Sequence, residues 1–402
     1  MYSIQPPLPG EDFFALPDND RLVLVLNTLE LDPMLTCLGE GPVGAGRRGF
    51  GARPLIYALI AAWVYELHSI AHLRRELLRN PSLRVLCGLS GKAVPSEDAF
   101  GRLLARLADN VEAVEAVFGR LRERICTLDP DLGAPIAIDS TAIHAWSDGN
   151  RSTPSDADAA WGKKGVSAKG RLGWWFGYKV HLAADTSAEL PLAYTVTPAN
   201  VGDGTELETL VKVVKESQPE VLAAVMADAA YAGEHNSRVV WETGALPVID
   251  FNSRGYELRP GFSEAHCPLC ECGQEMRYLG RDRVYVKYQR GPQCSCPNGP
   301  AITRWRIEDD IRWHPPLPRH TLKWQRLYRE RTSVERVNAR LKGHLRLDGI
   351  RHRGLDKVKV HVGLSLIVQL AGALAMMEAG NLRYARSIGP GLNRPGFRRD
   401  SG

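Results

Sequence analysis

The stretch Ile136-Ala137-Ile138-Asp139 marks the point where the 402-residue chain changes from helical to sheet-forming character. Its apolar run is too short for a helix, and a fully apolar run of this kind predicts a strand buried on both faces. A second apolar run, residues 221–227, is followed by Asp228. The sequence therefore predicts two buried strands that each deliver an acid to the end of a sheet.

The two acids predict a metal site if their strands are neighbours, because chemistry in open α/β sheets collects where strands end. Asp139 and Asp228 would then face each other, and two facing carboxylates do not both stay ionised in a low dielectric without a cation. Hard oxygen donors suit Mg²⁺ or Mn²⁺. The structural alternative for each acid alone is an ordinary cap at the beginning of a turn.

The remaining patterns predict a mixed α/β sheet of five strands with flanking helices. Residues 147–173 are rich in glycine, serine and aspartate and predict a loop. Further strands are predicted at 176–182, 190–196 and 245–251, and helices at 205–215, 234–243, 322–345 and 355–378. The last of these contains His361 and Gln369 within its apolar run, which favours a buried core helix over a membrane span.

The first 130 residues predict a separate all-α domain, because apolar residues recur at helical spacing and no strand pattern occurs. Pro95-Ser96-Glu97 is typical of a helix start. DNA binding and packing or dimerisation remain open as its role. The first twenty residues carry four acids and no apolar run, so no signal peptide is expected at this end of the sequence.

The predicted helix 322–345 adds a third acid. With about 100° per residue, Tyr328, Arg331, Glu335 and Lys342 fall on one narrow stripe along the rim of the apolar face. That position suits Glu335 as a further metal ligand, flanked by cations that bind phosphate. The structural alternative is an ordinary i,i+4 pair between Arg331 and Glu335.

Charge is unevenly distributed along the chain. The formal net charge is +5, yet residues 321–402 alone hold 17 Lys and Arg against 6 Asp and Glu. A folded, strongly basic segment most often meets a polyanion. Its arginines around the predicted helix are Arg326, Arg329, Arg336, Arg340, Arg346, Arg351 and Arg353. Residues 381–402 form a basic C-terminal tail. With 44% hydrophobic and 24% charged residues, the composition excludes a disordered, collagen-like or small disulfide-stapled protein.

Five of the eight cysteines lie within thirty residues of each other, in a segment of about 252–319 that interrupts the predicted sheet domain. Their spacing favours a structural Zn²⁺ site, with the ligand set open among all five. These are Cys267, Cys270, Cys272, Cys294 and Cys296. The alternatives are a site that has lost its metal and reduced thiols packed without one. The other three cysteines are scattered, as in a cytosolic protein.

Together these motifs resemble a known family. The spacing of Tyr328, Arg331, Glu335 and Lys342 resembles the Y-R-E-K signature of bacterial DDE insertion-sequence transposases. Residues 138–141 and 227–231 resemble the motifs of the first and second acid, although many relatives carry glycine where Ala230 stands. Residues 176–181, 190–192 and 197–200 are also typical of the family. The resemblance spans about residues 50–378, and four motifs in order are more specific than any one.

The resemblance implies a ribonuclease-H-like catalytic domain, residues 131–251 and 320–380, interrupted by the cysteine-rich insertion. Asp139, Asp228 and Glu335 would be the catalytic triad, holding two Mg²⁺ or Mn²⁺ ions. Arg331 and Lys342 would hold phosphates of the transposon end, and Tyr328 would stack on or bond to the displaced end. Arg336 and Arg340 would extend the DNA-binding surface.

The implied activity is metal-dependent cleavage of transposon ends and transfer of the 3′-hydroxyl into target DNA. The partner is double-stranded DNA, bound by a homodimer or larger assembly in the bacterial cytoplasm at the nucleoid, with no membrane involved. Two alternatives remain, a ribonuclease-H-like nuclease without strand transfer and a catalytically silent DNA-binding protein.

Overall fold

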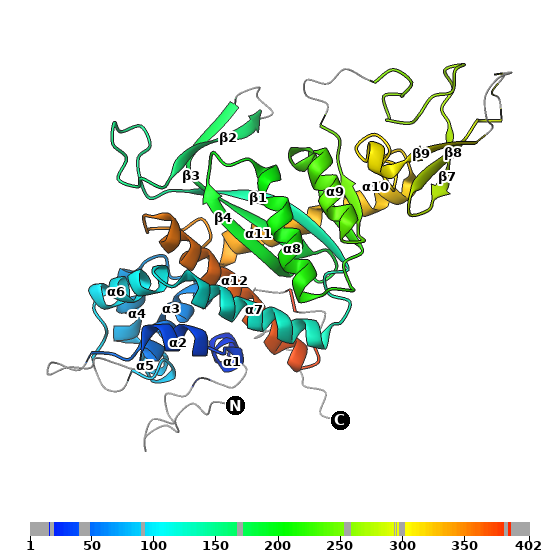
Figure 1. The fold of residues 1–402 in the computed structure, drawn as a ribbon. Helices are drawn as coiled ribbons and strands as arrows, with labels where there is room; N and C mark the ends of the chain where they lie inside the picture. Colours follow the sequence, from blue (N-terminus) through cyan, green and yellow to red (C-terminus); the bar gives the residue numbers. More distant parts are fainter. Residues whose placement is uncertain are drawn as a thin grey trace.

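A single mixed sheet organises the molecule, and helices cover both of its faces (Figure 1). The computed structural model describes residues 16, 20–39, 49–89, 93–166, 172–252, 259–292, 294, 296, 302–381 and 385–386. The basic tail predicted at 381–402 lies outside the described residues except for 381, 385 and 386.

The sheet has six strands in the order β2-β3-β1-β5-β6, with β4 also paired to β3. Strands β3 and β4 run antiparallel to their neighbours, whereas β5 and β6 run parallel to β1. The two predicted buried strands are neighbours, because β1 pairs with β5, so the condition set for a metal site between their acids is met. The strands are β1 (Pro135–His144), β2 (Ala160–Val166), β3 (Leu172–Asp185), β4 (Pro191–Pro198), β5 (Ala224–Ala227) and β6 (Leu246–Ile249).

The prediction of five strands was wrong, because β2 lies within the segment expected to be a loop. Its Gly162 leaves room for the Trp175 ring, which a Cβ atom at this position would approach to 2.5 Å. Trp161 pairs directly with Phe176 across the ribbon, at 5.6 Å between ring centroids. Glycines and lysines in the sequence conceal the strand, while aromatic packing onto β3 stabilises it.

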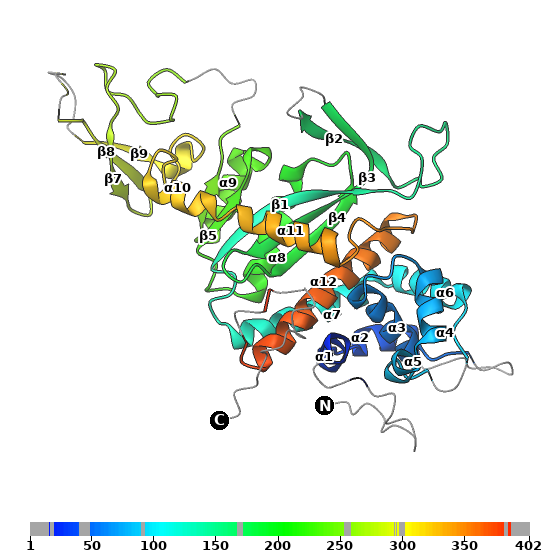
Figure 2. The same cartoon turned by 180° about the vertical axis from the view of Figure 1, so that it is seen from behind.

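The helices divide between the two faces of the sheet. In Figure 1, α8 (Leu207–Ser217) lies in front of the sheet, and in the reverse view of Figure 2, α11 (Thr332–His344) crosses it. Helix α9 (Glu234–Glu242) packs beside β6, and short 3₁₀ turns at Asp203–Glu206 and Ala229–Tyr231 connect the layers.

The predicted helix 322–345 is two helices rather than one, α10 (Leu322–Arg329) and α11. At the break, the backbone N–H groups of Glu330 and Arg331 donate to carbonyls three residues earlier instead of four. This tighter turn changes the angular positions that a continuous helix would give. The apolar face of α11 is nevertheless buried as expected, at Val334, Val337 and Leu341.

Seven helices precede the sheet, and the expectation of an all-α segment without strands is confirmed for its described residues. Ser96 caps its helix by accepting a hydrogen bond from the N–H of Ala99. These helices are α1 (Arg21–Thr28), α2 (Asp32–Leu38), α3 (Ala52–Val64), α4 (Ile70–Arg79), α5 (Pro81–Leu86), α6 (Glu97–Ala108) and α7 (Val111–Leu128).

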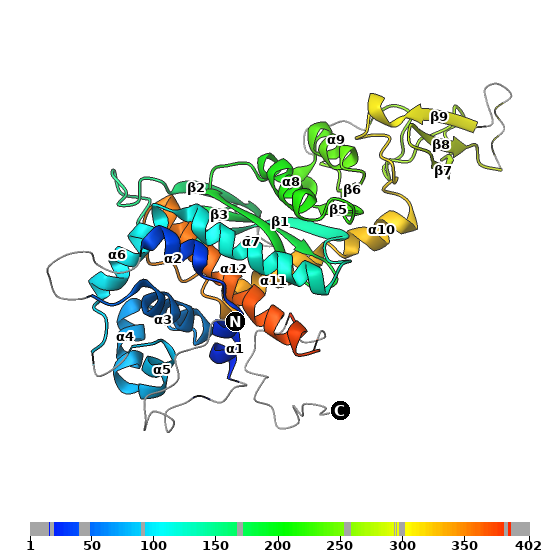
Figure 3. The same cartoon turned by 60° about the horizontal axis from the view of Figure 1, so that its bottom comes forward.

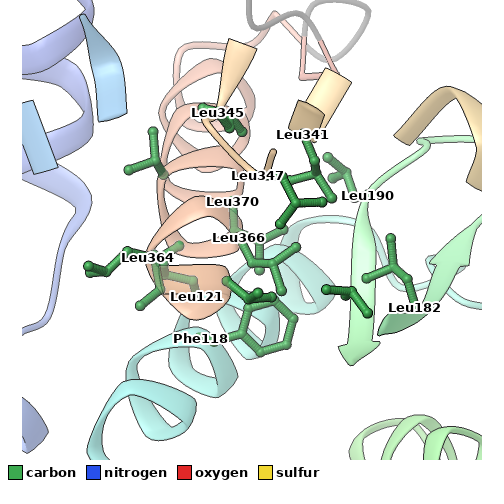
Figure 4. Packing of buried hydrophobic residues seen from close by; sticks show 14 of the residues in the cluster. Phe118, Leu121, Leu182, Leu190, Leu341, Leu345, Leu347, Leu364, Leu366 and Leu370 are labelled. Carbon is green, nitrogen blue, oxygen red and sulfur yellow. The ribbon is translucent and has the colours of Figure 1, made fainter. Parts of the chain in front are cut away.

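The last helix, α12 (Leu355–Glu378), joins the N-terminal helices to the sheet (Figure 3). It packs on α7, α1, α6 and β4, and in Figure 4 leucines of α12, α11 and β3 meet Phe118 of α7. Trp63 of α3 donates its indole N–H to Ser365 at 2.9 Å. Among the described residues, α12 alone is long and apolar enough to cross a membrane, but 94% of its apolar window is buried inside the protein.

The cysteine-rich insertion contains a small sheet with its own apolar cluster. Strands β7 (Arg277–Arg281), β8 (Tyr285–Gln289) and β9 (Ile302–Arg306) pair antiparallel, and a short 3₁₀ turn at Ile307–Asp309 follows. In Figures 1 and 2 this unit projects from the β6 side of the main sheet.

Burial of His361 in α12 makes stability sensitive to acid. Burial lowers its pKa to about 3, with the nearby Arg346 charge adding to the effect. Because the folded state resists a proton that the unfolded chain accepts, this contribution is complete above about pH 6.5 and is lost as pH falls toward 3. We expect His361→Gln to flatten the fall in the free energy of unfolding over this range, by up to about 1.4 kcal/mol per pH unit. Urea titrations at several pH values measure it, and parallel curves for the two proteins would contradict it.

Candidate active site

Strand register aligns three carboxylates along one level of the sheet. Ile138 of β1 pairs with Ala227 of β5, and Ala227 pairs with Ile249 of β6. The residues that follow these three are Asp139, Asp228 and Asp250. Parallel pairing therefore places acids from three successive strands side by side.

Asp139 is a partly buried acid with a raised pKa, and such an environment favours a neighbouring cation. Burial, helped by the negative charges of Asp228 and Glu335, raises its pKa to about 7, against the opposing effects of a backbone hydrogen bond and of Arg331. A carboxyl group with this pKa is about half protonated at neutral pH, and an approaching positive charge would favour its ionised form. The donor set is composed of hard oxygens, which matches Mg²⁺ or Mn²⁺.

Asp228 begins a tight turn that the surroundings hold in place. Its carboxylate accepts a hydrogen bond from the N–H of Ala230 at 2.8 Å. The amide of Asn236 donates to the carbonyl oxygens of Tyr231 and Gly204, at 2.9 and 3.0 Å. Hydrogen bonds from Asn236 therefore hold the loop after Asp228 against the turn that contains Gly204.

Glu335 lies on α11 with its side chain about half exposed, and its Oε1 is 2.7 Å from the guanidinium of Arg331. The carboxylates of Asp139, Asp228 and Glu335 do not all lie within 4.8 Å of one another, since the one described group that meets this limit is a cysteine cluster. Asp139 nevertheless interacts electrostatically with Asp228, Glu335 and Arg331, so these groups lie near one another, and Arg331 pairs with Glu335.

Asp250 is an acidic residue that sequence reasoning missed. The hydroxyl of Tyr328 donates to its carboxylate at 3.2 Å, and the Tyr328 ring stacks on Trp324 with centroids 4.6 Å apart. Burial and then the Asp250 charge raise the pKa of Tyr328 to about 12. The signal was present, because residues 246–250 repeat the pattern of an apolar run that ends in aspartate.

The other predicted DNA contacts are engaged within the protein. Arg336 and Arg340 both bind Glu189, a buried acid, and Arg340 also donates to its backbone carbonyl at 2.8 Å. Lys342 donates to the carbonyl of Ala142 at 2.8 Å and lies 3.3 Å from Asp348. These three cations hold α11 against β1 and the turn before β4.

The predicted basic surface is consequently smaller than the charge count suggests. Arg346 is 9% exposed and stacks over Trp63 at 4.4 Å. Arg326 and Arg329 remain exposed.

Two other acids of the segment, Asp185 and Asp203, have structural roles. Asp185 accepts hydrogen bonds from the backbone N–H groups of Gly133, Ser187 and Ala188 in the β3–β4 turn. Asp203 pairs with Lys179 at 2.8 Å.

Four of the five predicted cysteines come together. The sulfur of Cys270 lies 3.3 Å from those of Cys294 and Cys296, and Cys272 lies 3.6 Å from Cys294. Tetrahedral Zn–S bonds of about 2.3 Å would place sulfurs about 3.8 Å apart, so the cluster fits one zinc ion. Cys267 lies elsewhere, with its thiol donating to the carbonyl of Met276, so the five-residue set is corrected to four.

Carboxylates on neighbouring strands offer the hard oxygen donors that divalent cations prefer. A family model described as "Transposase DDE domain" matches residues 133–370, more than half of the chain. A second, described as "Transposase domain (DUF772)", matches residues 13–106. The chain therefore belongs to the DDE transposase family, whose members cleave DNA and transfer its strands in transposition.

Other comparisons are more distant. No curated protein matches the sequence. A solved structure titled as the piggyBac transposase synaptic complex with hairpin DNA is similar at 12% identity and a TM-score of 0.40, over 92% of this chain and 78% of that chain.

Glu189 should matter for stability far more than Glu335. Burial opposes ionisation of Glu189, but hydrogen bonds from Arg340 and Arg336 outweigh it and lower its pKa. Glu189→Gln leaves Arg340 without its counter-charge, so we expect a loss of about 3 kcal/mol in the free energy of unfolding. Glu335→Gln removes one exposed pair and should cost less than about 1 kcal/mol. Equal losses in urea titrations would contradict this assignment.

Proposed function

We propose that Asp139, Asp228 and Glu335 form the catalytic metal site of this DDE transposase. The observation that carries the proposal is the register that sets Asp139 level with Asp228, together with the raised pKa of Asp139 beside two further acids. Such a group is poorly accommodated as an anion unless a cation neutralises it. The site is therefore built to receive positive charge.

The position of Glu335 suggests how the site becomes complete. Its carboxylate is held by Arg331 at a half-exposed helix position, and we propose that a change of side-chain rotamer turns it toward the strand acids when metal binds. Arg331 would then be released to bind a phosphate of the DNA. The ion pair between Arg331 and Glu335 would be replaced by two others, one between Glu335 and the metal ion and one between Arg331 and phosphate.

Two divalent cations at these acids would activate a water or a DNA 3′-hydroxyl as nucleophile and stabilise the leaving oxygen. The chain's own residues would position the substrate. Arg331 binds an end phosphate, and Tyr328, already ordered by Trp324 and Asp250, presents the edge of its ring to the DNA. Lys342 fixes β1 relative to α11 through its bond to Ala142.

The sheet topology and the residue spacing in α10 and α11 support a more specific structural class and family group. We assign the sheet to the ribonuclease-H-like group because three antiparallel strands, β1, β3 and β4, are followed by β5 and β6 parallel to the first. The spacing from Tyr328 to Lys342 supports membership of the Y-R-E-K group. Two transposon ends must be joined together, so the active form would contain at least two copies on double-stranded DNA.

Replacing the acids provides the direct test. We expect Asp139→Asn, Asp228→Asn and Glu335→Gln each to reduce cleavage of end-containing DNA by at least about a thousandfold, because each removes a negatively charged ligand from the transition-state metal site. DNA affinity in EDTA should stay within about threefold of the parent. The assay uses labelled DNA that flanks the coding region, incubated with Mg²⁺ and a target plasmid.

The same assay separates the competing functions. A transposase yields labelled ends joined to the plasmid, whereas a nuclease yields cleaved ends without joined products. Asp185→Asn is the matched control within the segment, since that acid caps a turn distant from the reaction. Cleavage retained in any of the three acid variants would contradict the assignment of these acids as the catalytic triad.

We further propose that Cys270, Cys272, Cys294 and Cys296 bind one structural Zn²⁺ ion. The grouping of four sulfurs within 4.8 Å of one another supports it. The ion would connect the loop before β7 to the segment between β8 and β9, beside the apolar cluster of the insertion, against which Cys270 packs.

The zinc assignment predicts a specific set of ligands. Protein purified without chelator should contain one zinc per chain by mass spectrometry of the metal, and Cys270→Ser or Cys296→Ser should lower this at least tenfold, because the loss of a thiolate weakens the site. Cys267→Ser should keep the full content. Zinc lost in Cys267→Ser, or kept in the other two, would contradict the ligand set.

A further inference from the structure

Three tryptophans are exposed at one end of the main sheet, away from the proposed catalytic acids. Trp146, Trp161 and Trp174 are 52%, 42% and 58% exposed. Trp146 follows β1, and the other two lie on the β2–β3 ribbon, which extends beyond the rest of the sheet in Figures 1 and 2. Large indoles rarely stay in water without a partner.

The ribbon tryptophans share one face, and that face continues to the catalytic strand. Trp161 and Lys163 of β2 lie opposite Phe176 and Trp174 of β3. Even-numbered side chains of β3 point to the same side along its length, as far as Leu182, which lies opposite Asp139. At about 3.3 Å per residue, Trp174 is about 26 Å along the strand from Asp139, less than one turn of duplex DNA.

The ribbon is also uniformly basic. Between Asp158 and Asp185 the sequence contains no acidic residue. Lys163 is exposed, and its ammonium lies over the Trp174 ring at 6.0 Å from the centroid. On the neighbouring loop, Arg351 lies over Trp146 at 5.2 Å and Arg353 donates to its carbonyl. Cations therefore stand beside two of the three exposed indoles.

The reverse face of the ribbon explains its rigidity. Trp175 is buried against Gly162, and its indole donates to the carbonyl of Tyr178 at 3.3 Å. At Gly177, which has a φ of 157°, a Cβ atom would be 2.1 Å from the Ile143 carbonyl, so the ribbon crosses β1 closely. Trp161 and Trp174 are thus carried by paired strands, of which β3 also pairs with β1.

We propose that the β2–β3 ribbon is a DNA-binding arm that enters a groove of the duplex beside the cleavage site. Lys163 binds backbone phosphate, and Trp161 and Trp174 pack against base edges and sugars. A two-stranded ribbon fits a DNA groove, and apolar side chains commonly act there beside cations. This inference rests on the proposed function for the position of the cut, and on the family for DNA as the substrate.

Charge complementarity selects DNA over a second copy of the chain. A ribbon without acids would meet the same cations on an identical ribbon, and like charges repel. DNA offers phosphate groups to the cations of this surface and apolar bases to its tryptophans. The arm would lie on the duplex that leads away from the acids.

Binding in EDTA tests the arm independently of cleavage. The probe is a fluorescein-labelled duplex of about 30 base pairs, roughly three helical turns. We expect Trp161→Ala combined with Trp174→Ala to raise the Kd about tenfold. Lys163→Ala should reduce the slope of log Kd against log salt by about one, as expected for one phosphate contact. Lys163→Glu, which reverses the charge at this position, should weaken binding further.

Leu78→Ala and Lys212→Ala are the matched controls, an exposed apolar residue on α4 and an exposed cation on α8, and both should bind like the parent. Unchanged duplex Kd in the tryptophan variant and in Lys163→Glu would overturn the proposal. A loss confined to single-stranded DNA of the same sequence, or a change of mass in sedimentation without loss of DNA affinity, would overturn it too. Failure of the parent to cleave transposon ends would instead refute the proposed function, because the binding readout needs no cleavage.

Discussion

The parallel register between β1, β5 and β6 is the constraint on which the site depends. Side chains alternate along a strand, so a slip of one residue in β5 would turn Asp228 to the opposite face. Apolar burial protects this register, because Val225, Met226 and Ala227 have almost no exposed surface. The stability of the core thus determines where the acids lie, and the acids themselves contribute nothing favourable to it.

Burial of carboxylates is costly, and the structure offsets that cost locally. Arg331 is near Asp139 and pairs with Glu335, so one guanidinium partly neutralises a site with several negative charges. By contrast, Glu189 lies in the turn before β4 and pairs with Arg336 and Arg340 of α11 and with Arg386. The helix is therefore fixed firmly at Arg336 and Arg340, while Glu335 stays exposed and able to move. On one helix, Arg336 and Arg340 therefore stabilise the fold, whereas Glu335 is the proposed metal ligand.

Sequence reasoning predicted the buried strands and most helices, because apolar periodicity reports burial directly, whereas the pairing of the two strands was only assumed as a condition. It missed β2, since that strand is held by contacts of Trp175 and Phe176 that no local pattern shows. It joined α10 to α11 because hydrophobic spacing does not record a change of hydrogen-bond register. Asp250 was overlooked although it follows the same apolar pattern as Asp228. Among the cysteines, spacing alone did not separate Cys267 from the four whose sulfurs meet.

Net charge was an incomplete guide to the DNA-binding surface. The excess of positive charge lies in residues 321–402, yet Arg336, Arg340 and Lys342 are bound to the protein itself. The β2–β3 ribbon contributes fewer cations to the total, but the sequence between Asp158 and Asp185 contains no acid. What a polyanion meets is the charge left after internal pairing. A cation that already has a buried partner must break that bond before it binds phosphate, whereas Lys163 is free of this cost, so affinity for DNA should follow unpaired surface charge more closely than charge counted by segment.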